Sequence, residues 1–291
     1  MRALLFAPGA DERKLSKVSG FGADAIVIDL EDAVAESQKT VARALARAAI
    51  PKYGDQQIVA VRVNAIQSGR LEGDIAAVVC PQLAAIVVPK VEESDTLHDA
   101  DRALAAAERE HGVEVGTIRL MPLIETALGI VRVEEILLSA PARALTALFG
   151  LADLAADLGV ELTPEGAELL YARGRMIVAA RAAGMTAPID GPYLRLSDDD
   201  GLIADCRRSR GLGFQGRVTV HPKQVASTQR VYSELTEEEL AAQRRIVEGF
   251  EHAQRAGLAA VQVDGRFVDQ PVYQLARRRL AGYESLVASG E

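Results

Sequence analysis

Eight short apolar runs recur along the first part of the chain, and segments with helical character separate them. Short apolar runs bounded by small or polar residues are typical of buried parallel strands. Eight such strands alternating with helices predict a (β/α)₈ TIM barrel, an α/β fold. A doubly wound open sheet is the alternative. The predicted strands cover residues 3–7, 24–30, 58–63, 85–88, 118–124, 144–149, 187–190 and 216–220.

Each predicted strand ends in residues that break the apolar pattern. In a barrel the C-terminal ends of all strands form one rim, and active sites are built there. We therefore expect the polar residues that follow the strands to surround one site; an open sheet would also carry its site at this edge. They are Pro8 with Gly9, Glu31 with Asp32, Arg62 with Asn64, Lys90, Glu125, Asp153, Asp190 and His221.

Glu125 and Asp153 follow the consecutive fifth and sixth strands, so the sequence predicts that they lie near each other. Two carboxylates without a histidine form a hard oxygen donor set that suits Mg²⁺ rather than zinc. The alternative is that both are ordinary solvated loop acids. No GxGxxG or GxxxxGK[ST] sequence follows a strand, so a dinucleotide or P-loop site is unsupported.

Composition excludes several classes of protein. The chain has 291 residues, 49% of them hydrophobic, which is enough for a large core. Its net charge of −8 argues against nucleic acid as the main partner. No apolar run approaches the ~18 residues of a membrane span, and the N-terminal run is too short for a secretory signal. Cys80 and Cys206 suggest neither a zinc site nor a disulfide scaffold. We expect a cytoplasmic protein.

The last segment lies outside the eightfold pattern, so we predict a barrel over residues 1–231 and a C-terminal extension over residues 232–291. Thr236 and Glu239 form a capping-box pattern at the start of a helix. Asp264 and Gly265 form a two-residue hairpin turn within VQVDGRFVD, and a last helix begins near Pro271. An apolar hairpin with no strand to join needs another surface, and a second subunit would provide one. We expect a lid or an oligomer contact.

Nine motifs resemble, in order, those of the citrate lyase β-subunit-like branch of the HpcH/HpaI aldolase superfamily, which includes malyl-CoA and citramalyl-CoA lyases. Their collinearity over nearly the whole chain makes the resemblance specific. The sequence departs from several relatives at Leu128 and Ala152, which leaves the acyl group open. The motifs are LLFAPG (4–9), DLEDAV (29–34), VRVN (61–64), VPKVE (88–92), LIETALGI (123–130), FGLADL (149–154), IDGPY (189–193), GFQGRVTVHPKQV (213–225) and VDGRFVDQPV (263–272).

The resemblance implies a Mg²⁺-dependent enzyme that makes or breaks a carbon–carbon bond beside a CoA thioester. Glu125 and Asp153 match the family's metal ligands, and Arg62 matches its substrate-carboxylate arginine. Asp269 matches a catalytic aspartate on a C-terminal lid, and we predict that it acts in a neighbouring subunit's barrel. The alternative is that Asp269 only caps the last helix. A homo-oligomer, trimer or hexamer, is expected.

Further residues have two possible roles each. Glu31 and Asp32 would hold metal-bound waters or fix the joint between strand and loop. Lys90 and Gly150 would contact substrate, although Lys90 could instead pair with Glu31 or Glu92. The remaining two, Lys39 and Arg43, lie on one helix face and would meet CoA phosphates or solvent.

The leading hypothesis is a lyase that cleaves or forms a 3-hydroxyacyl-CoA of the malyl, citramalyl or citryl type. Its products would be acetyl-CoA, or a related acyl-CoA, and a 2-oxo acid. The first alternative is a malyl-CoA-type thioesterase on the same scaffold. The second is a non-autonomous β subunit of a citrate lyase complex that uses a thioester on an acyl carrier.

Overall fold

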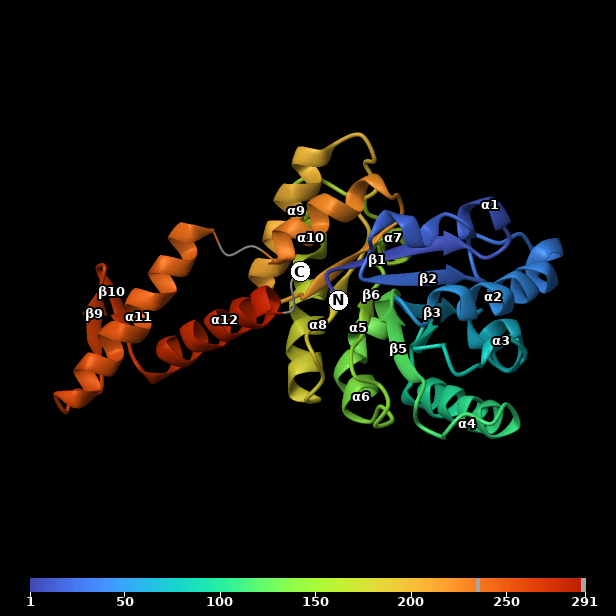
Figure 1. Ribbon diagram of the computed structural model, residues 1–291, viewed down its shortest axis with the longest axis horizontal. Coiled ribbons are helices and arrows are strands. Elements are labelled where there is room, and N and C mark those ends of the chain that lie inside the picture. Colours follow the sequence, from blue (N-terminus) through green and yellow to red (C-terminus); the bar gives the residue numbers. More distant parts are fainter. Residues whose placement is uncertain (234–235, 289–291) are drawn as a thin grey trace. The chain divides into compact units, whose positions relative to one another are not determined.

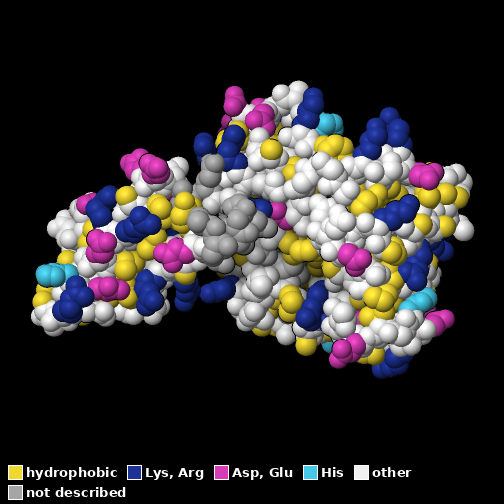
Figure 2. All heavy atoms as spheres, viewed as in Figure 1, with side chains coloured by type: hydrophobic (Ala, Val, Ile, Leu, Met, Phe, Trp, Pro, Cys, Tyr) yellow, Lys and Arg dark blue, Asp and Glu magenta, His cyan; other side chains and the backbone are white. Residues whose placement is uncertain are grey.

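The computed structural model describes residues 1–233 and 236–288. The chain divides into two compact units, Met1–Tyr232 and Ser233–Glu291. Among the described residues, no helix combines the length and apolar character that crossing a membrane requires. On the face seen in Figure 2, Lys and Arg side chains are interspersed with Asp and Glu rather than gathered in one basic area.

The first unit is a closed barrel in which parallel strands follow one another in chain order, with helices around them (Figure 1). The barrel closes where β1 pairs with β8, with Leu4 opposite Val218. The predicted (β/α)₈ fold is confirmed. Its strands are β1 (Ala3–Pro8), β2 (Ala25–Asp29), β3 (Ile58–Arg62), β4 (Ala85–Val88), β5 (Arg119–Ile124), β6 (Leu148–Phe149), β7 (Ile189–Asp190) and β8 (Gly216–Thr219).

The helices of this unit occupy the intervals between strands, as the alternating pattern predicts. They are α1 (Glu12–Leu15), α2 (Lys39–Tyr53), α3 (Leu71–Val78), α4 (Ser94–Glu110), α5 (Ala127–Val131), α6 (Val133–Leu138), α7 (Leu151–Leu158), α8 (Leu170–Ala182), α9 (Asp199–Leu212) and α10 (Lys223–Ser233). Short 3₁₀ turns are η1 (Val18–Phe21), η2 (Glu36–Gln38), η3 (Ile66–Ser68) and η4 (Ala167–Leu169).

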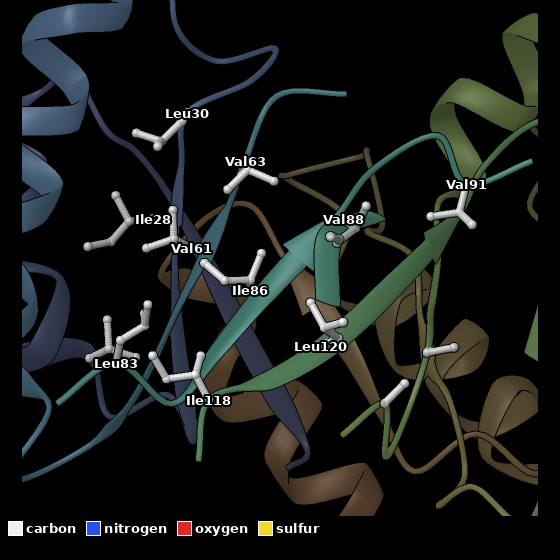
Figure 3. Packing of buried hydrophobic residues seen from close by; sticks show 14 of the residues in the cluster. Ile28, Leu30, Val61, Val63, Leu83, Ile86, Val88, Val91, Ile118 and Leu120 are labelled. Carbon is white, nitrogen blue, oxygen red and sulfur yellow. The ribbon is translucent and has the colours of Figure 1, made fainter. Parts of the chain in front are cut away.

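The core has two layers because side chains alternate along each strand. Inside the barrel, residues such as Val27, Val87 and Leu123 form one buried cluster. The intervening strand residues, such as Ile28, Val61 and Ile86, face outward into a larger cluster that the helices cover, part of which Figure 3 shows. Parallel strands buried on both faces need continuous apolar runs, which is why the sequence marks them so clearly.

Two strands have at most half the length that the sequence predicts. The predicted strand 144–149 pairs regularly only at Leu148 and Phe149, although Ala144 forms an isolated bridge to Leu120. Between them, the Thr146 side-chain hydroxyl donates to the Ala187 carbonyl, beside backbone hydrogen bonds from Thr186 to Leu145 and from Ile189 to Ala147. The seventh strand, predicted over residues 187–190, pairs regularly only at Ile189 and Asp190.

The second unit contains α11 (Glu237–Arg255), the hairpin β9 (Val261–Val263) and β10 (Arg266–Val268), and α12 (Gln270–Ala288). The predicted capping box is present at Thr236 and Glu239. The predicted hairpin is present too, and Asp264 and Gly265 have φ of 51° and 77°, as a type I′ turn requires. Phe250 and Tyr273 stack with ring centroids 4.9 Å apart in the small core of this unit.

Candidate active site

Arg62, the last residue of β3, forms a bidentate pair with Asp29, the last residue of β2. The two residues are opposite each other in the strand register. Arg62 donates from Nε to Asp29 Oδ1 at 2.8 Å and from Nη2 to Oδ2 at 2.7 Å. Burial would raise the pKa of Asp29, but hydrogen bonds and charge from Arg62 hold that pKa below its usual value. This bidentate pair therefore fixes one edge of the guanidinium.

The other side of Arg62 faces the loop after β2. Its Nη1 lies 3.1 Å from Glu31 Oε2 and 3.5 Å from Asp32 Oδ2. Lys90 Nζ lies 3.1 Å from Glu31 Oε1 and 3.5 Å from Asp32 Oδ1, so both acids lie between two cations. Burial raises the pKa of Glu31, while the charge of Arg62 opposes that rise. The result is a compact ionic cluster at the C-terminal rim.

Lys90 follows β4 with a left-handed backbone, at φ 50°. This conformation is uncommon for a residue with a side chain. Its backbone N–H donates to Glu125 Oε1 at 2.9 Å, while its side chain reaches Glu31. One residue thus ties the loop after β2 to the end of β5.

Glu125 follows β5 and is only 1% exposed. Burial, and then the negative charge of Asp153, raise the pKa of Glu125 to about 8. Asp153 lies in the first turn of α7, directly after β6. Gly150 lies between β6 and α7, and a β-carbon there would lie 2.6 Å from Glu125 Oε2. Because Gly150 has no side chain, the Glu125 carboxylate can lie directly beside it.

A family model described as HpcH/HpaI aldolase/citrate lyase matches residues 2–222, well over half of the chain. The chain belongs to this family. Citrate lyase subunit beta from Leuconostoc mesenteroides subsp. cremoris is 35% identical over 296 residues, which cover 99% of this chain and 95% of that protein. A (3S)-malyl-CoA thioesterase from Cereibacter sphaeroides is also 35% identical, over 99% of this chain and 96% of that protein.

Among solved structures, CitE from Mycobacterium tuberculosis, in complex with magnesium, acetoacetate and coenzyme A, is similar with a TM-score of 0.78. The two chains are 26% identical, and the match covers 97% of this chain and 98% of that one. The resemblance on which the sequence-based identification rests is thereby confirmed.

The donor set at the rim of this HpcH/HpaI family member is compatible with a divalent cation. Within residues 1–233 and 236–288, no group of three or more His, Cys, Asp or Glu side chains is arranged to hold a metal. Glu125 and Asp153 provide two carboxylates, the number that the sequence predicts. Two neighbouring acids, one of them buried, repel each other unless a proton or cation intervenes. Their all-oxygen chemistry fits Mg²⁺.

Lys39 and Arg43, predicted at CoA phosphates, have partners within the barrel unit. Lys39 Nζ donates to the carbonyls of Leu30 and Glu31, at 2.8 and 2.7 Å. Arg43 Nε donates to Asp74 Oδ1 at 2.6 Å, and Asp74 also accepts from the backbone and side chain of Asn64. These bonds brace the loops after β2 and β3. Contact with CoA stays a prediction.

Asp190 does not join the rim cluster, contrary to the expectation that it would. Its neighbour Ile189 points into the barrel, so Asp190 points outward into the helix layer. There it is fully buried and lies 3.0 Å from Arg173 and 2.8 Å from Arg217. His221 accepts a hydrogen bond from the Lys223 N–H at the start of α10, which is a structural role.

Asp29 is the site residue that the sequence analysis missed. The signal was present, because Asp29 is an acid at the end of a strongly apolar run and a buried carboxylate needs a partner. Arg62 lies near the end of the next predicted strand, so parallel pairing of the two strands would have brought them together.

Asp269 lies in the second unit, directly before α12. Its Oδ1 accepts from the Val272 N–H at 3.3 Å, in the manner of a helix N-cap. The capping alternative is therefore present in the structure. It does not exclude the predicted catalytic role, which stays a proposal.

Proposed function

We propose that this chain is a Mg²⁺-dependent carbon–carbon lyase that cleaves or forms a 3-hydroxyacyl-CoA of the malyl, citramalyl or citryl type. The observation that carries the proposal is a set of two neighbouring pairs at the strand ends. Glu125 lies near Asp153, and Arg62 is bound bidentately by Asp29. The family membership and the magnesium and coenzyme A in the CitE complex support it.

Glu125 and Asp153 would hold the Mg²⁺. When bound, the ion supplies Lewis-acid polarisation of the carbonyl of a 2-oxo acid. Arg62 would bind the carboxylate of the same 2-oxo acid, and Asp29 keeps its guanidinium from rotating away. Lys90 supports this arrangement by donating its N–H to Glu125. We also propose that Gly150 contributes to the substrate site by leaving its space open.

In the cleavage direction, the 3-hydroxyl group loses its proton and the bond between C2 and C3 breaks. The electron pair of that bond remains on C2 of the acyl-CoA as an enolate, which must gain a proton. We propose Asp269 as the acid and base for this transfer. Condensation is the reverse, with proton removal from C2 of the acyl-CoA and attack on the carbonyl carbon of the 2-oxo acid.

A thioesterase is the second candidate, because a (3S)-malyl-CoA thioesterase is as similar to this chain as a citrate lyase β subunit is. In that reaction water cleaves the thioester and free CoA is released with the intact hydroxy acid. The third candidate is a β subunit whose substrate is a thioester on an acyl carrier protein. All three would use the same rim residues. Small acyl thioesters and 2-oxo acids are the proposed substrates, in a homo-oligomer whose size chromatography or ultracentrifugation would establish.

One panel separates these candidates. Malyl-, citramalyl-, methylmalyl- and citryl-CoA are each incubated with the protein and Mg²⁺, products are identified by mass, and free thiol is followed with a thiol reagent. A lyase yields a shorter acyl-CoA and a 2-oxo acid without free thiol. A thioesterase yields free CoA. Activity only on the acyl-carrier thioester identifies a complex subunit, and cleavage of none of these thioesters refutes the proposed function.

A further inference from the structure

Arg62 has only one side left for a substrate carboxylate. A guanidinium can bind a carboxylate bidentately through two of its edges. Asp29 occupies the edge formed by Nε and Nη2, with both hydrogen bonds under 3 Å. A second bidentate carboxylate must use the edge formed by Nη1 and Nη2, and Nη1 already lies 3.1 Å from Glu31 Oε2. Substrate and Glu31 therefore compete for the same nitrogen.

Glu31 is held close to Arg62 but not well bonded to it. Its Oε2 is buried and has no hydrogen-bond partner of good geometry, so its contact with Nη1 is ionic only. Its other oxygen, Oε1, accepts a hydrogen bond from Lys90 Nζ at 3.1 Å. A substrate carboxylate that makes an aligned hydrogen bond to Nη1 can therefore displace Glu31, provided that Lys90 retains it.

Asp32 is the natural comparison within the same loop. It carries the same charge and lies 3.5 Å from both Arg62 and Lys90. Its side chain is 49% exposed, whereas that of Glu31 is 6% exposed. Water and salt screen an exposed charge far more than a buried one, so Asp32 competes little for Arg62.

We infer that Glu31 is an internal competitor for the carboxylate-binding side of Arg62, and that Lys90 sets the affinity for substrate by drawing Glu31 away. This inference rests on the proposed function, in which Arg62 binds the carboxylate of a 2-oxo acid. It makes Glu31 and Lys90 positioning residues for the substrate.

The test measures binding of glyoxylate, pyruvate and oxaloacetate by calorimetry in the presence of Mg²⁺, so it does not depend on turnover. Glu31→Gln should tighten binding of the best of these acids by about tenfold, because a buried competing charge is removed. Asp32→Asn, the comparison variant in the same loop, should tighten binding less than Glu31→Gln does, because the half-exposed charge of Asp32 is screened. Lys90→Met should weaken binding about tenfold by releasing Glu31 toward Arg62.

The decisive comparison is a double-mutant cycle, because removing any cation weakens anion binding to some extent. If Lys90 acts through Glu31, Lys90→Met should change affinity by less than about threefold when Glu31→Gln is also present. The inference is overturned if Lys90→Met weakens binding equally in both backgrounds, or if Glu31→Gln tightens binding no more than Asp32→Asn does.

Failure to fold and failure of the wild-type protein to bind have separate consequences. If Glu31→Gln does not fold, as judged by thermal unfolding, Glu31→Ala replaces it in the same cycle with the same expectation. If the wild-type protein binds none of the three acids with Mg²⁺ present, the proposed function fails and this inference fails with it. Wild-type binding together with a failed cycle removes only the inference.

Discussion

Gly150 lies so close to the Glu125 carboxylate that only a residue without a side chain fits at position 150. A β-carbon at position 150 would lie 2.6 Å from Glu125 Oε2 and would also overlap the Glu125 β-carbon. The Gly150 N–H donates to the Ile124 carbonyl at 2.9 Å, which holds the two strand ends together. The turn after β6 thus fixes where the buried carboxylate can point.

The first prediction follows from this contact. Gly150→Ala should displace the Glu125 carboxylate and raise the Mg²⁺ concentration needed for activity by at least about tenfold, since ligand positions matter within fractions of an ångström. The measurement is a Mg²⁺ titration of activity. Gly174→Ala is the control, because a β-carbon there meets nothing within 4 Å and the residue lies within α8. That control should keep full activity and gain up to about 1 kcal/mol of stability.

The second prediction concerns pH. The pKa of Glu125 is about 8 in the folded state, above its ordinary value of 4.5. Between these two pH values the folded state therefore holds a proton that the unfolded state has released. Stability from this group is therefore present at low pH and is lost as pH rises toward about 8, by at most roughly 1.4 kcal/mol for each pH unit.

Urea unfolding in EDTA checks this pH dependence. Wild type should lose stability from about pH 5 to pH 8, and Glu125→Gln should show a flatter profile. Glu31 contributes with the same sign because its pKa is also raised, so the relevant quantity is the difference between the two proteins. Parallel profiles would contradict the assignment to Glu125.

The sequence predicted the barrel because each strand is a short apolar run and each interval is long enough for a helix. It also predicted which strand ends carry polar groups. It did not reliably predict whether each of these side chains points into the barrel or outward, since a shift of one residue along a strand moves a side chain to the other face. Asp190 was misplaced for that reason. Asp29 was missed because burial and pairing across strands depend on contacts between segments distant in sequence.

The third prediction concerns the metal. Glu125→Gln and Asp153→Asn should each abolish Mg²⁺-dependent activity, because each removes one of two proposed anionic ligands. Mg²⁺ should raise the midpoint of thermal unfolding of wild type, and this shift should vanish in both variants. A Mg²⁺-induced shift that survives in both variants would place the ion elsewhere.

The fourth prediction concerns Arg62. Arg62→Lys keeps the charge but loses the planar guanidinium, which pairs with Asp29 through one edge and leaves another edge for substrate. Activity should fall roughly a hundredfold, corresponding to about 3 kcal/mol of transition-state binding. Arg175→Lys, which alters an arginine paired with Glu134 on the surface, is the control and should keep full activity. Wild-type kinetics in Arg62→Lys would exclude Arg62 from the site.

The last prediction is that Asp269 acts as general acid and base, and that it serves a neighbouring subunit. Its capping bond to Val272 offers a way to separate catalysis from structure. Asn is as good an N-cap as Asp, whereas Ala is not. Asp269→Asn should therefore keep the thermal stability of wild type and lose activity, while Asp269→Ala should lose activity and about 1 kcal/mol of stability. Full activity in Asp269→Asn would leave Asp269 with the capping role alone.

Action between subunits is tested by mixing two inactive variants, Asp269→Asn and Arg62→Ala, under conditions in which subunits exchange. If Asp269 serves another subunit, some sites in the hybrids combine an intact Arg62 with an intact Asp269, and part of the activity returns. If each site uses the Asp269 of its own chain, every site in the hybrids carries one defect and activity stays lost. Mass spectrometry of the mixture confirms that hybrids have formed, so that lost activity in their presence rules out sharing between subunits.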